Sequence, residues 1–310
     1  MAYELHFAPL QGYTDAVFRN AFAKYFGGVD VYYTPFIRIE KGDFRRRDLR
    51  DLEPEANRVP ELVPQILPGT PDELRRLAEA VQAKGYRAAD INLGCPFPPI
   101  AGKRKGAGML PHPDLVEEVL RATEEFPEML FSLKMRLGWE EGCECMNLVD
   151  AINSLRLRHV TVHARTGKQQ YKGPTNPEAF AAFYERCRQP LFYNGDLLSP
   201  EDIHSIRERF PLLRGVSVGR GFLSSPFMGA ECKGIAVPIG NERANVIFDF
   251  HNELLSVYSE RLQGEAQLLS KMKSLWEHFL PETDRKLLKQ IHKSNRLETY
   301  REAVRKIFQP

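Results

Sequence analysis

A cysteine stands between an apolar segment and a loop rich in glycine and basic residues. Residues 88–93 are mostly apolar and end in Gly94-Cys95-Pro96, and Lys103-Arg104-Lys105 follows a few residues later, flanked by glycines. A thiol at the end of a strand, beside a flexible cationic loop, is well placed to face a polyanion. A buried cysteine next to a turn gives the same local pattern, so the rest of the chain has to decide between the two interpretations.

Polar side chains follow nearly all of the strand-like segments. The expected strands span residues 4–8, 29–33, 62–67, 89–93, 129–134, 159–163, 191–193 and 215–218. In a parallel barrel the C-terminal strand ends form one face, so the side chains that follow the strands should meet there. They are Gln11, Arg38, Gln65, Asn92 with Cys95, Lys134 with Arg136, His163 with Arg165, Asn194 with Asp196, and Arg220. A face so evenly filled with hydrogen-bonding groups indicates a cofactor site.

Helical segments alternate with these strands. Residues 71–84 and 200–209 are amphipathic, and each begins with a proline, which the first turn of a helix accepts. Thr70, Asn176 and Ser199 each precede such a proline as an N-cap. The alternation predicts an α/β fold of the (β/α)8 TIM-barrel type. A doubly wound sheet is the alternative, although its Gly-x-Gly-x-x-Gly turn is missing after the first strand.

The strand pattern stops near residue 244. The segments after it read as helices, at residues 245–262, 265–279, 285–291 and 295–308. We therefore expect a barrel domain, residues 1–244, followed by a small all-helical domain, residues 245–310. Basic residues outnumber acidic ones from Arg285 onward, which is typical of a nucleic-acid-binding surface. A solvated helix face would show the same excess.

Composition restricts the class of protein. The chain of 310 residues is 43% hydrophobic and 27% charged, as expected for a globular protein. It has no run of about 18 apolar residues, which a membrane span needs, and its N-terminal segment lacks the pattern of a signal peptide. Five scattered cysteines favour free thiols in a reducing cytoplasm. The pair Cys143-x-Cys145 lacks further ligands at suitable spacing, so we expect no metal site.

Two glycine-containing turns follow the last two expected strands. In Asn194-Gly195-Asp196 and Gly219-Arg220-Gly221 the backbone can approach an anion closely, and Arg220 offers a fork for phosphate. The loops after the seventh and eighth strands of a barrel often hold a phosphate. Lys134 at the fifth strand suits an anionic flavin ring or an enolate oxygen. Each of the two glycine-containing turns, taken alone, could be an ordinary surface turn.

These residues, in this order, resemble the tRNA-dihydrouridine synthase family. The matching motifs are Ala8-Pro9-Leu10-Gln11-Gly12-Tyr13-Thr14-Asp15, Asn92-x-Gly94-Cys95-Pro96, Lys134-x-Arg136, His163-x-Arg165-Thr166, Asn194-Gly195-Asp196 and Gly219-Arg220-Gly221. Each motif is moderately specific, and the ordered set, with a helical C-terminal region, is strongly so. Pro35-Phe36-Ile37-Arg38 and Ser270–Trp276 look closest to the subgroup that acts on position 16 of tRNA.

The resemblance implies an FMN-dependent enzyme that uses NADPH to reduce a uridine in tRNA to dihydrouridine, as a monomer. Cys95 is implied as the general acid. The residues implied in FMN binding are Pro9, Leu10, Gln11, Gln65, Lys134, His163, Asn194, Gly195, Asp196, Gly219 and Arg220. Those implied in RNA binding are Arg38, Asn92, Arg136, Arg165, Lys271 and Lys273.

The chain departs from the family pattern in places. Leu10 stands where methionine is usual, a change that conserves volume. Ala164 stands where glycine is common, and Phe97-Pro98-Pro99 replaces a more polar run, which should stiffen the loop after Cys95.

Two other functions remain open at the level of sequence. An FMN barrel that oxidises or reduces a small molecule would explain the phosphate-type turns and Lys134, but it leaves the basic helical region without a role. An RNA-binding barrel without catalysis would explain the basic residues, but not the polar set from Gln65 to Arg220.

Overall fold

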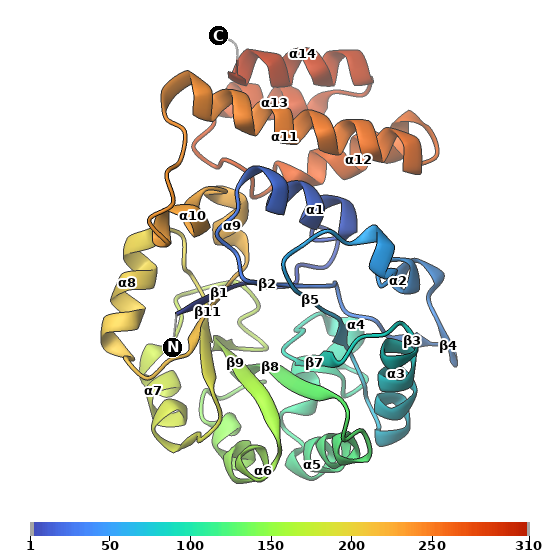
Figure 1. The fold of residues 1–310 in the computed structure, drawn as a ribbon, viewed down its shortest axis with the longest axis vertical. Helices are drawn as coiled ribbons and strands as arrows, with labels where there is room; N and C mark the ends of the chain where they lie inside the picture. Colours follow the sequence, from blue (N-terminus) through green and yellow to red (C-terminus); the bar gives the residue numbers. More distant parts are fainter. Residues whose placement is uncertain (1–2, 309–310) are drawn as a thin grey trace.

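A computed structural model describes residues 3–308 (Figure 1); the outermost residues of the two predicted domains, 1–2 and 309–310, lie outside it. Its main sheet is parallel, in the order β5-β2-β1-β11-β10-β9-β8-β7-β6. These strands are β1 (Glu4–Phe7), β2 (Val31–Tyr33), β5 (Leu62–Val63), β6 (Gln65–Ile66), β7 (Ala88–Leu93), β8 (Leu130–Gly138), β9 (Leu157–Thr166), β10 (Leu191–Asn194) and β11 (Gly215–Val218). The edge strands β5 and β6 are two halves of one segment, so the sheet closes into a barrel. The predicted (β/α)8 architecture is confirmed.

Helices surround the barrel (Figure 1). The main ones are α1 (Ala16–Tyr25), α3 (Pro71–Ala83), α5 (Pro113–Arg121), α6 (Val149–Ser154), α7 (Pro177–Arg186) and α8 (Pro200–Arg209). The predicted N-caps are confirmed, since the side chains of Thr70, Asn176 and Ser199 accept backbone N–H groups of α3, α7 and α8. Each cap satisfies a donor that the helix leaves unpaired, so these three side chains define where their helices begin.

Three strand predictions needed correction. Strand β8 continues to Gly138 and β9 to Thr166, so Lys134 lies within a strand and not at its end. Pro64 interrupts the strand expected over residues 62–67, because proline has no N–H for the ladder. The short hairpin of β3 (Ile39–Glu40) and β4 (Asp43–Phe44) was not predicted from the sequence.

Further short helices were not predicted either. They are α2 (Arg46–Arg50), α4 (Pro98–Ala101), α9 (Arg220–Ser224) and α10 (Met228–Cys232). Both prolines after Phe97 lie in the first turn of α4, where an N–H is not needed. The Phe97-Pro98-Pro99 departure from the family pattern therefore starts a helix beside Cys95.

Four helices follow the barrel and cover its α1 side (Figure 1). They are α11 (Gly240–Arg261), α12 (Gly264–Leu275), α13 (Arg285–Lys293) and α14 (Leu297–Phe308). The buried ring of Phe250 on α11 makes an edge contact with Phe18 of α1. Within the helical region, the hydroxyl of Tyr300 accepts a hydrogen bond from Trp276 and lies 2.7 Å from Nε2 of His251. The predicted helical region is confirmed, although α11 begins earlier than residue 245.

No helix within residues 3–308 has the length and apolar character needed to cross a bilayer.

Candidate active site

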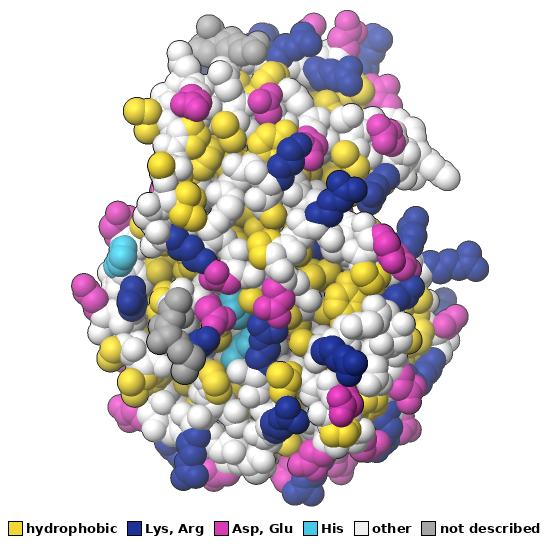
Figure 2. Space-filling model, in the orientation of Figure 1, with side chains coloured by type: hydrophobic (Ala, Val, Ile, Leu, Met, Phe, Trp, Pro, Cys, Tyr) yellow, Lys and Arg dark blue, Asp and Glu magenta, His cyan; other side chains and the backbone are white. Residues whose placement is uncertain are grey.

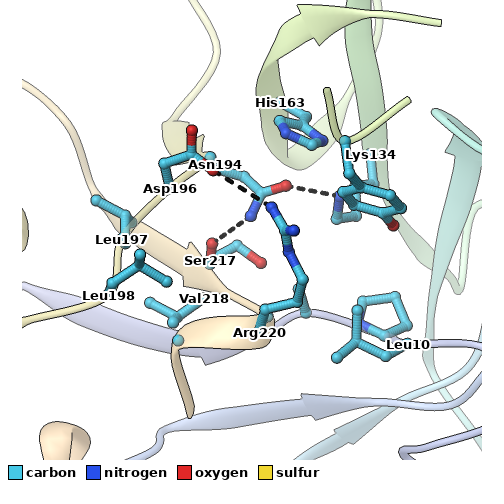
Figure 3. Close-up of a pocket in the computed structure, with 16 residues that line it drawn as sticks. Leu10, Lys134, His163, Asn194, Asp196, Leu197, Leu198, Ser217, Val218 and Arg220 are labelled. Carbon is cyan, nitrogen blue, oxygen red and sulfur yellow. Dashed lines mark hydrogen bonds and ion pairs between the residues drawn. The ribbon is translucent and has the colours of Figure 1, made fainter. Parts of the chain in front are cut away.

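A polar cavity opens at the C-terminal ends of the strands (Figure 3). It gathers these predicted cofactor residues: Pro9, Leu10, Lys134, His163, Asn194, Gly195, Asp196, Gly219 and Arg220. Because parallel strands end on one face, residues from distant parts of the sequence meet here. The cavity is also lined by Ala8, Tyr171, Leu197, Leu198, Ser217, Val218 and Gly221.

Lys134 presents an ammonium group to this cavity. Its Nζ donates to Oδ1 of Asn194 at 3.0 Å, and Nδ2 of Asn194 donates to the carbonyl of Ser217 at 2.6 Å, which fixes the amide (Figure 3). Burial, helped by the positive charge of Arg136, lowers the pKa of Lys134 to about 8. Burial and the surrounding cations also hold the pKa of His163 well below its usual value. The cavity thus combines a cation with a neutral imidazole.

Arg220 and Asp196 form the cationic and anionic rim of the cavity. Nη2 of Arg220 lies 3.3 Å from the Asp196 carboxylate (Figure 3). The same carboxylate also pairs with the buried Arg165. The guanidinium of Arg220 lies 4.6 Å from the ring centroid of Tyr171. Arg220 is only partly buried, so its guanidinium can still reach an anion.

The two predicted glycine turns need glycine for different reasons. Gly195 has φ +131°, and a Cβ there would lie 2.7 Å from the Thr175 methyl carbon. A Cβ on Gly221 would lie 1.9 Å from the carbonyl oxygen of Leu197. Gly221 therefore packs against Leu197, the residue after the Asn194-Gly195-Asp196 turn, and both turns line the cavity. Glycines let the backbone of such turns approach an anion closely.

Cys95 lies on the loop after β7. Its backbone N–H donates to Oδ1 of Asn92 at 2.8 Å, and its carbonyl accepts from Ala107 at 3.0 Å. The thiol is half-buried, and desolvation raises its pKa, while the charges of Arg136 and Lys134 act to lower it. Cys95 is not among the residues that line the cavity, but its loop borders the strand that carries Lys134, since a Cβ on Gly94 would lie 3.3 Å from the carbonyl oxygen of Lys134.

Some predicted site residues lie outside the cavity lining. Gln11 is exposed on the loop after β1. Gln65 and Asn92 are buried and hydrogen-bonded to each other at 2.8 Å, below the Cys95 loop. A contact of either with flavin or RNA stays a prediction.

The two strand arginines assigned to RNA are buried in this structure. Arg136 is 1% exposed and donates to the carbonyls of Gly94 and Thr166, while Arg165 is 3% exposed and donates to that of Gly173. A guanidinium that donates to internal carbonyl groups has few donors left for a ligand. The geometry supports a role for both in holding loops, and their contact with RNA stays a prediction.

The other predicted RNA contacts are partly occupied. Nζ of Lys271 lies 2.7 Å from the carbonyl of Gly12 and 2.8 Å from the Asp15 carboxylate, which joins the helical region to the barrel. Lys273 donates to the carbonyl of Ser294. Arg38 is half-buried beside Glu40 at 3.5 Å.

No role was predicted for Asp90, Ser132 and Ser217, which lie inside β7, β8 and β11 ahead of the last residue of each strand. The signal available was Asp90-Ile91-Asn92: two polar residues at a spacing of two point to the same side of a strand. Among residues 3–308, no group of three or more His, Cys, Asp or Glu side chains is placed to hold a metal ion.

Fold and cavity define a TIM-barrel protein with a cationic site at the C-terminal strand ends. The chain belongs to the dihydrouridine synthase family, since the model of that family, described as "Dihydrouridine synthase (Dus)", matches residues 6–310. It is 28% identical over 284 residues to the tRNA-dihydrouridine(16) synthase of Haemophilus ducreyi, covering 88% of this chain and 85% of that one. It is 26% identical over 262 residues to tRNA-dihydrouridine synthase B of Pasteurella multocida, covering 81% and 77%.

Solved structures show the same barrel. An old yellow enzyme homologue from Zymomonas mobilis matches with a TM-score of 0.53 at 10% identity, covering 76% of this chain and 90% of that one. At that identity the similarity establishes the fold alone.

Proposed function

We infer that this protein reduces the C5=C6 bond of a uridine in tRNA to dihydrouridine, with FMN as cofactor and NADPH as reductant. The observation that carries the proposal is the convergence of Lys134, Asn194 and Arg220 on one cavity, in a chain of the dihydrouridine synthase family. The Cys95 loop packs against the strand that carries Lys134. Its relatives are named as tRNA-dihydrouridine synthases, which supplies the substrate class.

The cavity suits a flavin mononucleotide. Cationic Lys134 and Arg220, neutral His163 and the backbone of the two glycine turns provide donors for an anionic ring and a phosphate, and Pro9 and Leu10 provide an apolar wall. Bound and reduced, FMN would supply the hydride that C6 of uracil needs.

Cys95 would supply the proton. Reduction at C6 builds up enolate charge on the uracil, and a donor near C5 completes the reaction when the S–H bond breaks and a C–H bond forms. Because burial raises its pKa, the Cys95 thiol stays protonated at neutral pH and can act as an acid. The resulting thiolate would be stabilised by the charges of Arg136 and Lys134.

The helical region would bind the RNA. Lys286, Lys289, Lys293 and Lys306 line a groove between α13 and α14, and Figure 2 shows basic side chains on this end of the molecule. Such a groove attracts a phosphate backbone without reading sequence. The target uridine must also leave its stack to reach the cavity, which costs a few kcal/mol and is easiest in an unpaired loop.

The test uses the purified full-length protein with NADPH and tRNA from cells that lack it. We expect a yellow protein with FMN absorbance and new dihydrouridine at one mapped position, which also decides between position 16 and another site. Cys95→Ala should keep the flavin and lose at least about 100-fold in rate, whereas Cys187→Ala, at another half-buried free thiol, should not. Turnover of a small unsaturated carbonyl compound with unmodified tRNA, or a colourless protein, would refute the proposal.

A further inference from the structure

Three buried polar side chains form one layer across adjacent strands of the barrel. Gln65 on β6 is in register with Asp90 on β7, which is in register with Ser132 on β8. Their exposed fractions are 1%, 1% and 0%. None of the three lines the cavity described above. Burying a carboxyl group at such depth costs free energy of folding unless both its oxygens are hydrogen-bonded.

Both oxygens of Asp90 are used. Oδ1 accepts from the Ser132 hydroxyl at 2.6 Å, and Oδ2 accepts from Nε2 of Gln65 at 2.6 Å. Oε1 of Gln65 in turn accepts from Nδ2 of Asn92 at 2.8 Å. Oδ1 of Asn92 then accepts the backbone N–H groups of Gly94 at 3.0 Å and Cys95 at 2.8 Å. A continuous chain of hydrogen bonds therefore runs from Asp90 to the backbone of Cys95.

The direction of this chain is fixed from both ends. The backbone N–H of Cys95 can only donate, so the Asn92 oxygen must face it and the Asn92 amino group must face Gln65. At the other end, Oδ2 of Asp90 accepts, so the Gln65 amino group must face it. An amide has two orientations of similar shape, and here only one of them makes every bond.

We propose that Asp90 is a positioning residue: it sets the orientation of the Gln65 and Asn92 amides and thereby holds the loop that carries Cys95. The proposal rests on the assignment of Cys95 as the acid in the proposed function. Asp90 acts through two other side chains and is not among the residues that line the cavity. Its nearest competing role is a purely electrostatic one, because its charge also acts on Lys134.

Two substitutions at this position separate the two roles. In Asp90→Ala the acceptor for Gln65 is lost and the chain loses its anchor. In Asp90→Asn the amide oxygen can still accept from Gln65, while its amino group can donate to Ser132, whose hydroxyl can accept. If Asp90 acts by positioning, Asp90→Asn should therefore behave like wild type. If it acts through its charge on Lys134, Asp90→Asn should behave like Asp90→Ala.

The first measurement requires neither flavin nor RNA. The full-length variants are treated with iodoacetamide, and alkylation of Cys95 is followed by mass spectrometry relative to the exposed Cys143 of the same sample. We expect relative alkylation of Cys95 to rise at least threefold in Asp90→Ala, because the loop is released, and to stay within about 1.5-fold of wild type in Asp90→Asn. An unchanged rate in Asp90→Ala, or equal rates in the two variants, would overturn the proposal.

The second measurement is the rate of dihydrouridine formation. In Asp90→Ala, kcat should fall at least tenfold while KM for tRNA changes less than twofold, and Asp90→Asn should restore most of the rate. Ser132→Ala removes one bond of the layer and should give a smaller change in the same direction. The control is Ser154→Ala, where an exposed hydroxyl donates to Ala151 at 2.8 Å. If wild type forms no dihydrouridine, the proposed function fails, and the alkylation result still decides the role of Asp90.

Discussion

Gly106 lies directly against Cys95 with a backbone that only glycine adopts easily. Its φ is +57°, and a Cβ at this position would lie 2.8 Å from the carbonyl oxygen of Cys95 and 2.9 Å from its Cβ. The next residue, Ala107, donates to that carbonyl at 3.0 Å. Gly106 therefore allows the basic loop to close onto the proposed acid.

Gly106→Ala should damage the site more than it damages the fold. The left-handed conformation costs about 1–2 kcal/mol for an alanine, and the added methyl group must push the Cys95 backbone away. We expect dihydrouridine formation to fall at least tenfold, with FMN still bound, as read from flavin absorbance and a tRNA assay.

Gly85 provides the matched control for this substitution. It lies between α3 and β7 with φ +83°, and a Cβ added there would have no other atom within 4 Å. Gly85→Ala should lose a similar free energy of unfolding in urea titrations but keep its activity. Equal losses of activity in both variants would show that strain alone, and not contact with Cys95, explains the effect.

Lys134 should make the free energy of unfolding of the flavin-free protein depend on pH in a defined window. Its pKa is lowered from 10.5 to about 8 by burial, so above pH 8 the unfolded chain binds more protons than the folded one. Burying the Lys134 cation lowers the free energy of unfolding. This loss is complete below pH 8, where both the folded and the unfolded chain are protonated, and it disappears as the pH rises toward 10.5. At pH 7 it is on the order of 3 kcal/mol.

The measurement compares Lys134→Met with wild type by urea denaturation at pH 7, 8.5 and 9.5. The variant should be more stable at pH 7, and this advantage should shrink as the pH rises. The same substitution at the exposed Lys103 serves as the reference for loss of a surface cation. A constant difference between Lys134→Met and wild type over this range would contradict a lowered pKa.

The order of parallel strands predicts where the cavity lies, but not where each strand ends. Lys134, His163, Asn194 and Arg220 meet because parallel strands end on one face, and that follows from topology alone. Strand β8 nevertheless runs on past Lys134 to Gly138, alternating apolar and polar residues. A polar side chain that points into a barrel looks the same in the sequence as one that ends a strand.

Hydrogen-bond partners were the part that the sequence could not supply. Lys105 belongs to the basic loop near Cys95, yet its Nζ lies 2.7 Å from a carboxylate oxygen of Glu73 on α3. Arg165 pairs with Asp196, which belongs to a different strand end. Such pairs depend on how elements pack, so a basic residue in a functional motif cannot be assigned to a ligand before its neighbours are known.

Lys271 is a predicted RNA contact whose ammonium group has partners within the protein. The resemblance assigned it to RNA, but its ammonium lies 2.8 Å from Asp15, which caps α1 and also accepts the hydroxyl of Tyr258 at 2.6 Å. In this geometry Lys271 ties the helical region to the loop that carries Pro9 and Leu10. Lys289 in the α13–α14 groove has no such role within the described residues and is the matched comparison.

The salt dependence of tRNA binding distinguishes a lysine that holds the helical region to the barrel from one that contacts a phosphate. Each phosphate contact contributes about 0.7–0.9 to the slope of log K against log salt. Lys289→Ala should therefore reduce the slope by about that amount, whereas Lys271→Ala should leave the slope unchanged and lower the free energy of unfolding by about 1 kcal/mol. A reduced slope in Lys271→Ala, without loss of stability, would instead assign this lysine to the RNA, because only a group that displaces counterions from the phosphates alters the slope.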